Sequence, residues 1–140
     1  MATVEAYRKL VVARAGGACE YCRLLQDATG VTFHLEHVLP RSSGGETVLA
    51  NLALSCPACN MAKAKRVRGT DAAGVEHDLF NPRAYDPWLL GWHLHFMLER
   101  KTGRIIARTR IGEATVFALK MNSRSRAFAR KLQIEAGLIA

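Results

Sequence analysis

The chain has 140 residues, a length typical of one domain with a modest core. Apolar residues make up 49% and charged residues 23%, which excludes long disorder and fibrous repeats, and no apolar run approaches the roughly 18 residues of a membrane helix. Twenty basic against 12 acidic side chains give a formal net charge of +8, which favours a polyanionic partner such as nucleic acid, although a solvated basic face explains the charge alone equally well.

The two ends of the chain differ in character. The last 40 residues hold nine of the basic side chains and two of the acidic ones. The first residues, MATVEAYRKL, lack the basic and then apolar pattern of a secretory signal, so we expect a cytoplasmic protein. Residues 3–14 have the pattern of an amphipathic helix with Thr3 as its N-cap, and Gly16 and Gly17 are expected to end it.

Four cysteines are grouped as two CxxC pairs. Cys19 and Cys22 form the first pair and Cys56 and Cys59 the second, with 33 residues between the inner cysteines. Thiols stay reduced in a cytosol, and two tight knuckles from distant parts of a chain satisfy tetrahedral zinc. The rival interpretation is a redox CxxC, which normally opens a helix in a larger α/β unit. We therefore expect a structural zinc held by four cysteines.

A zinc finger with two cysteines and two histidines is a second rival. Cys19 and Cys22 followed by His34 and His37 nearly have its spacing, but both gaps are too short. Residues 31–39 are also rich in β-branched and apolar side chains and predict a strand, on which positions 34 and 37 point to opposite faces. The finger is therefore rejected.

The segment between and just after the knuckles carries side chains that can bind a metal ion and act as a base. Pro40 closes the predicted strand, a turn-rich loop follows at 40–45, and good helix formers after Cys59 predict a short helix. A carboxylate, an imidazole and two carboxamides can hold a hard divalent cation and place a base next to it. These candidates are Glu36, His37, Asn51 and Asn60.

The motifs CEYC, LEHVLPRSSGG, Asn51-Leu52 and CPACNMAK, which together span residues 19–63, resemble those of the HNH (His-Me finger, ββα-metal) endonucleases with two zinc knuckles. The resemblance implies an α+β fold: a ββα-metal core stapled by a four-cysteine structural zinc, with an N-terminal helix and a C-terminal β-hairpin plus helices. It also implies a single HNH nuclease domain over residues 1–140, with its core at 19–66 and a C-terminal extension at 75–140.

The resemblance assigns a role to each candidate. His37 corresponds to the general base that takes a proton from the attacking water, and Glu36 and Asn60 correspond to ligands of a divalent metal, Mg²⁺ or another such as Mn²⁺. Asn51 corresponds to the residue that holds the loop so that His37 is aimed. Relatives more often have Asp where this chain has Glu36. Because neighbours on an ideal strand face opposite ways, we expect a turn or bulge at these two residues.

The C-terminal extension is expected to pack against the core and to contact nucleic acid. Residues 92–96 alternate as in a strand, 102–103 mark a turn and 104–110 a second strand, so we expect a β-hairpin followed by helices at 113–121 and 125–136. Phosphate contacts are expected from basic side chains beside the site and on this hairpin, namely Lys63, Lys65, Arg66, Arg68, Arg104, Arg108 and Arg110.

Two functions follow from the sequence. The first is a metal-dependent endonuclease or nickase that acts on duplex or branched DNA, with RNA as a possible substrate, no membrane partner, and a monomeric or homodimeric state. The alternative is a catalytically inactive, zinc-stabilised nucleic-acid-binding module. Taken singly, a Glu-His pair on a strand is usually surface and an asparagine after a knuckle usually caps a helix. The complete set of Glu36, His37 and Asn60 favours the enzyme.

Overall fold

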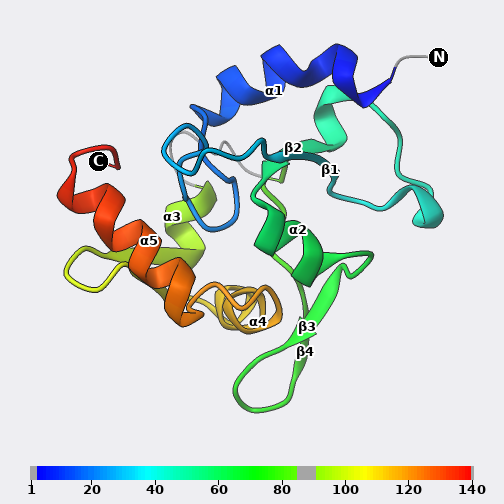
Figure 1. The fold of residues 1–140 in the computed structure, drawn as a ribbon. Helices are drawn as coiled ribbons and strands as arrows, with labels where there is room; N and C mark the ends of the chain where they lie inside the picture. Colours follow the sequence, from blue (N-terminus) through cyan, green and yellow to red (C-terminus); the bar gives the residue numbers. More distant parts are fainter. Residues whose placement is uncertain (1–2, 85–90, 140) are drawn as a thin grey trace.

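The computed structural model describes residues 3–84 and 91–139 (Figure 1). The chain opens with a 3-10 turn, η1 (Val4–Tyr7), and continues as the helix α1 (Arg8–Ala15). Gly16 ends α1 in the left-handed region, with φ of 62°, a conformation that glycine adopts without steric cost. The predicted N-terminal helix is therefore present, although the Thr3 side chain makes no capping hydrogen bond.

A β-hairpin followed by a helix forms the centre of the fold. The strands β1 (His34–His37) and β2 (Leu52–Ser55) pair antiparallel, with His37 opposite Leu52, and α2 (Pro57–Lys63) follows directly. All four residues of β2 are buried, and α1 packs across this hairpin (Figure 1). The strand predicted at 31–39 is thus shorter than expected. The long connection between β1 and β2 contains two 3-10 turns, η2 (Arg41–Ser43) and η3 (Leu49–Asn51).

A second hairpin, which the sequence did not predict, projects from the other side of α2 (Figure 1). Its strands β3 (Arg68–Thr70) and β4 (Glu76–Asp78) pair antiparallel. The Arg68 guanidinium binds the Glu76 and Asp78 carboxylates of the facing strand, each at 2.6 Å. Cross-strand pairs of opposite charge stabilise such a ribbon where its faces are too polar to show an alternating pattern.

The prediction of a strand at 92–96 is wrong. Those residues form most of a short helix, α3 (Gly91–His95), and the strand β5 (Phe96–Glu99) begins only where the helix ends. Burial explains the error. Trp92, His95 and Phe96 are buried whereas His93 and Leu94 are exposed, so the apolar face recurs at helical spacing rather than at every second residue. The turn at 102–103 is confirmed, because β5 pairs with β6 (Arg104–Ala107).

Two helices complete the described chain. The helix α4 (Arg110–Ala118) begins three residues before the predicted start, because the Thr109 hydroxyl accepts a hydrogen bond from the Gly112 amide and caps the helix there. Arg110 therefore lies on a helix and not on a strand. The helix α5 (Arg124–Glu135) lies one residue from its predicted bounds. The helix α4 packs against both the second and the third hairpins, and α5 packs against β6. In Figure 1, α4 lies below α2 and α5 lies to the left of α2.

One buried cluster joins the first half of the chain to the extension. It runs from Val11 in α1, through Leu52 and Leu54 in β2, to Trp92 and Met121. Polar contacts cross the same boundary, because the Trp92 indole donates to the Tyr21 carbonyl at 2.8 Å and Arg83 pairs with the buried Glu20. Three antiparallel hairpins and five helices, counted over residues 3–84 and 91–139, confirm the α+β class. No helix in those ranges has the length and hydropathy that a membrane crossing requires.

Candidate metal centre and active site

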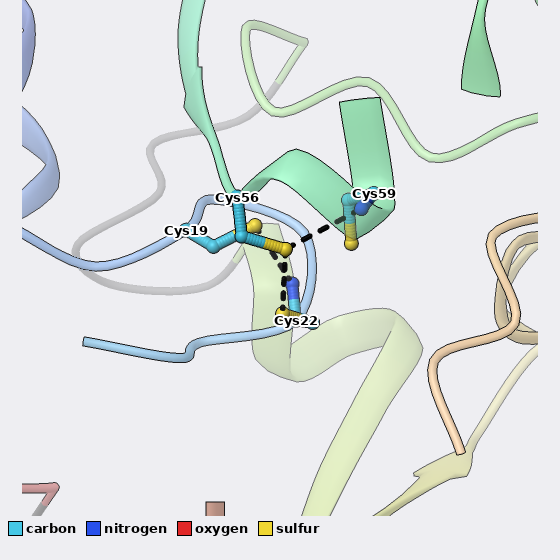
Figure 2. A group of neighbouring side chains, drawn as sticks. All are labelled: Cys19, Cys22, Cys56 and Cys59. Atoms are coloured by element: carbon cyan, nitrogen blue, oxygen red, sulfur yellow. Dashed lines mark hydrogen bonds between the residues drawn. The ribbon is translucent and has the colours of Figure 1, made fainter. Parts of the chain in front are cut away.

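Two segments far apart in the sequence bring the four cysteines together (Figure 2). The ligand sulfurs of Cys19, Cys22, Cys56 and Cys59 all lie within 4.8 Å of one another, and all four side chains are buried, free thiols. The sulfurs of Cys22 and Cys56 are 3.7 Å apart. A tetrahedron with metal–sulfur bonds of about 2.3 Å separates its ligands by roughly 3.8 Å. The donors and their spacing suit a structural zinc.

Backbone amides support this interpretation of the cluster. The Cys22 amide points to the Cys19 sulfur at 3.5 Å and the Cys59 amide to the Cys56 sulfur at 3.4 Å, so each pair turns back on its own first cysteine. Burial raises the pKa of the Cys19 thiol well above its ordinary value, which a bound cation would reverse because it favours the thiolate. The convergence of both pairs on one point favours zinc over a redox pair, and neither His34 nor His37 belongs to the cluster.

The second group of candidate residues lines a pocket at the end of β1. Its volume is about 310 Å³, and β1, the loop after it and α2 all contribute to its wall. Glu36, His37 and Asn60 line it together with the basic residues Arg41 and Lys65. The expected bulge is absent, because β1 pairs with β2 residue by residue through His37. Both neighbours line one pocket because it opens at the end of the strand.

Glu36 is buried, with 7% of its surface exposed. Its Oε1 atom accepts hydrogen bonds from the Tyr21 hydroxyl at 3.1 Å and from the Lys63 ammonium at 2.8 Å. Its Oε2 atom is also buried and has no hydrogen-bond partner among the residues described. Burial raises the pKa of the Glu36 carboxyl, and the Lys63 charge opposes that shift. A buried carboxylate oxygen without a partner is a position that a cation would satisfy.

Lys63 does not lie on the surface, which corrects the expectation that it contacts phosphate. Only 2% of it is exposed, and besides Glu36 its ammonium group donates to the Val38 carbonyl at 3.0 Å. The ammonium is therefore the counter-ion of the acid beside the candidate base. Removing either partner of such a buried pair leaves an uncompensated charge, at a cost of about 3–5 kcal/mol.

His37 is half-buried at the rim of the pocket. Its Nε2 atom shares a hydrogen bond of 2.8 Å with the Thr47 hydroxyl of the loop between β1 and β2. Burial lowers the pKa of His37 below its ordinary value, and the nearby Arg41 guanidinium lowers it further. Both effects favour the neutral imidazole, the form that accepts a proton.

The side chain of Asn51 closes the loop that follows His37. Its Oδ1 atom accepts from the Leu39 amide at 2.8 Å, and its Nδ2 atom donates to the Leu39 carbonyl at 3.0 Å and the Glu46 carbonyl at 2.9 Å. Asn51 thus fixes the backbone two residues beyond the histidine. Gly45 allows this closure, because a Cβ atom there would lie 1.8 Å from the Leu39 carbonyl oxygen.

Asn60 occupies the first turn of α2, next to the last cysteine. Its backbone amide donates to the Cys56 carbonyl at 2.9 Å, so the helix that carries a zinc-site cysteine also fixes this residue. Its side chain lines the pocket and makes no hydrogen bond to any residue in 3–84 or 91–139. The carboxamide oxygen is free to face a ligand there.

The other basic residues expected to contact phosphate differ in whether their side chains are exposed and free of protein partners. Lys65 is exposed and lines the pocket. Arg66 is exposed but donates to the Ala62 and Ala118 carbonyls, and Arg68 is held by two carboxylates. On the extension, Arg104 and Arg108 are not buried, whereas Arg110 lies 3.9 Å from Asp71 and 3.6 Å from Glu113.

Sequence reasoning missed three residues of this site. Arg41 and Thr47 belong to the turn-rich loop, where nothing in the sequence distinguishes them from ordinary polar loop residues. Tyr21 lies inside the first knuckle, and its hydroxyl donates a hydrogen bond to Glu36 of β1. The spacing of the cysteines gives the knuckle but does not show where its middle residues point.

Comparison with known proteins agrees with this geometry. No curated protein and no solved structure matches the chain. Residues 19–66 match the family model described as HNH endonuclease, and this range begins at the first cysteine and includes both knuckles, the β1–β2 hairpin and α2. Residues 19–66 are therefore similar to the HNH endonuclease family.

Proposed function

We propose that this protein is a metal-dependent DNA endonuclease or nickase whose active site is the pocket at the end of β1. The observation that carries the proposal is that Glu36, His37 and Asn60 line one pocket together with Arg41 and Lys65. A carboxylate, an imidazole and a carboxamide beside two cations suit the hydrolysis of a phosphodiester, in which negative charge builds on the phosphate oxygens.

His37 acts as the general base in this proposal. With Nε2–H donating to the Thr47 hydroxyl, Nδ1 is the basic nitrogen, and no residue in the described ranges hydrogen-bonds to it. Nδ1 takes the proton of the attacking water, and Thr47 and the Asn51 clamp keep the ring in place. The lowered pKa of His37 keeps the imidazole neutral at the start of the reaction.

Glu36 and Asn60 are the residues that would hold the divalent metal. The unpartnered Oε2 of Glu36 and the free carboxamide oxygen of Asn60 are hard donors, which suit Mg²⁺ or Mn²⁺. A bound metal would act as a Lewis acid at the scissile phosphate and stabilise the leaving oxygen. Arg41 and Lys65 would hold the flanking phosphates by charge.

One observation favours the alternative, a nucleic-acid-binding module without catalysis. Glu36 is buried and Lys63 already compensates its charge, so the carboxylate has a stable partner without any metal. A module of this kind would use the basic pocket rim for backbone contacts and leave Glu36 as a structural ion pair. The two functions differ in whether a divalent metal supports cleavage.

A plasmid-nicking assay separates them. Wild-type protein is expected to nick supercoiled DNA with Mg²⁺ or Mn²⁺, and His37→Ala is expected to lower the rate by about 100- to 10,000-fold because the base is lost. His34→Ala is the matched control, since His34 lies on the same strand but is exposed and outside the pocket. Zinc content and circular dichroism should match wild type in both variants. If all three proteins bind DNA and none cuts it with any divalent metal, the module is correct.

A further inference from the structure

The helix α5 places two buried arginines against the cysteine cluster. Arg126 and Arg130 lie one turn apart on one face of the helix, and 7% of Arg126 and 0% of Arg130 is exposed. The Nη1 atom of Arg126 donates to the Cys59 sulfur at 2.9 Å and lies 4.0 Å from the Cys56 sulfur. The family match ends at residue 66, so these side chains come from outside the matched domain.

Buried arginines usually pair with a carboxylate, and neither of these two does so within the described residues. No carboxylate in residues 3–84 or 91–139 pairs with Arg126 or Arg130. Arg126 also donates to the Leu119 carbonyl, and Arg130 donates to the Gly103 carbonyl at 2.7 Å and the Met121 carbonyl at 2.6 Å. Carbonyls satisfy hydrogen bonds but do not neutralise a cation, and a buried cation without an anion is costly.

The anion that remains is the cysteine cluster. Four thiolates around one Zn²⁺ carry a net charge of about −2, which equals in size the charge of the two guanidiniums. The Nη1 atom of Arg126 lies within hydrogen-bond distance of the Cys59 sulfur, so this guanidinium contacts the cluster directly. Arg130 lies one turn further along the same buried face of α5. Each partner thus compensates the cost of burying the other.

We infer that Arg126 and Arg130 are the counter-ions of a zinc–thiolate centre, so that metal binding holds α5 against residues 19–66. Without the metal, the four sulfurs would no longer be held together as one anionic centre, and α5 would lose the contact between Arg126 and Cys59 of α2. The third hairpin would be affected too, because Gly103 packs so closely under α5 that a Cβ atom there would lie 2.0 Å from the Ala127 carbonyl oxygen. This inference does not depend on whether the domain cuts nucleic acid.

Charge substitution at one position tests it. Arg126→Gln keeps a hydrogen-bond donor but removes the charge, and zinc affinity measured by competition with a chromogenic chelator is expected to fall about 10- to 100-fold, the usual effect of changing a residue that contacts a metal ligand. Arg126→Lys keeps the charge and is expected to retain most of the affinity. Arg124→Gln is the positional control, because Arg124 lies on the same helix and is exposed. If the role of Arg126 were purely steric, zinc affinity would fall equally in Arg126→Gln and Arg126→Lys.

A second measurement uses the wild-type chain, so that it does not depend on how the variants fold. Hydrogen exchange of the α5 amides is followed while a chelator removes zinc, and protection across Arg124–Glu135 is expected to fall at the chelator concentration at which zinc leaves. Two results would overturn the inference: unchanged zinc affinity in Arg126→Gln, or full protection of α5 after the metal has gone.

Discussion

At the residue scale, the pKa of His37 links the geometry of the pocket to a measurable pH dependence. Burial and the Arg41 guanidinium both lower this pKa. A general base works in its neutral form, so the nicking rate should fall as pH decreases through the pKa of His37 and level off above it. Arg41→Ala removes the charge that helps to lower the pKa, and the midpoint of the acid limb is therefore expected at a higher pH than in wild type.

Arg41→Lys is the control for this prediction, because it keeps the positive charge beside the ring. Its rate is free to change, since lysine does not reproduce the planar contacts of a guanidinium with phosphate, but the midpoint of its acid limb should stay near that of wild type. The measurement is the nicking rate across a pH series from acid to mildly alkaline, at saturating metal. A midpoint that stays in place in Arg41→Ala, or moves to lower pH, would show that His37 is not the titrating base.

At the scale of elements, the loop between β1 and β2 depends on one close contact. A methyl group at Gly45 would overlap the Leu39 carbonyl and lie 2.9 Å from Asn51 Nδ2, the atom that clamps the loop. Gly45→Ala is therefore expected to force the clamp open, to lower stability by about 1–3 kcal/mol through overpacking, and to reduce nicking by about ten-fold or more while zinc stays bound. Thermal melts, zinc content and nicking rates measure these effects.

The neighbouring glycine provides the control for Gly45. Gly44 has a φ of 92° and open space where a Cβ atom would lie, and asparagine tolerates the left-handed region better than other residues do. Gly44→Asn should therefore keep nearly wild-type nicking and stability. Equal losses in both variants would mean that loop flexibility, and not the Leu39–Asn51 contact, sets the geometry of the site.

The elements differ in how far the sequence predicts them. The knuckles, β1 and α2 are predictable because each has a local signal: fixed cysteine spacing, β-branched residues closed by Pro40, and good helix formers after Cys59. The 92–96 segment is not, because five residues that alternate in polarity fit a strand as well as one turn of helix, and tertiary burial of Trp92 and His95 decides between them. The Thr109 cap is hidden inside an apparent strand.

The candidate site is predictable in its composition but not in its pairings. Glu36, His37 and Asn60 line one pocket, as the motif order indicates. The ion pair between Lys63 and Glu36 is not predictable, because a lysine after a knuckle has the same sequence signature whether it points to solvent or back under the strand. Arg126 and Arg130 are not predictable as buried residues either. In the sequence they look like ordinary surface arginines, because nothing near them shows that their side chains point inward. Long-range charge compensation leaves no periodic signal in a sequence.

At the scale of the whole molecule, this charge compensation changes the meaning of the basic excess. Lys63, Arg126 and Arg130 are buried, and carboxylates hold Arg68, so these cations add nothing to a surface that meets a polyanion. Lys65 and Arg41 at the pocket, and Arg104 on the extension, are exposed. Net charge therefore overstates the number of cations that can face phosphate, and the salt dependence of binding measures the number that do.

Lys65 gives the most direct test of which surface nucleic acid meets. Each lysine that neutralises a phosphate releases about one counter-ion, so the slope of log affinity against log salt is expected to decrease by about 1 in Lys65→Ala. Lys65→Arg retains the charge and should retain the slope. Filter binding or fluorescence anisotropy with a duplex, between roughly 50 and 200 mM salt, measures both. An unchanged slope in Lys65→Ala, with affinity intact, would place the nucleic acid on a face other than the one with the Glu36, His37 and Asn60 pocket, and the proposed active site would then have no substrate to cut.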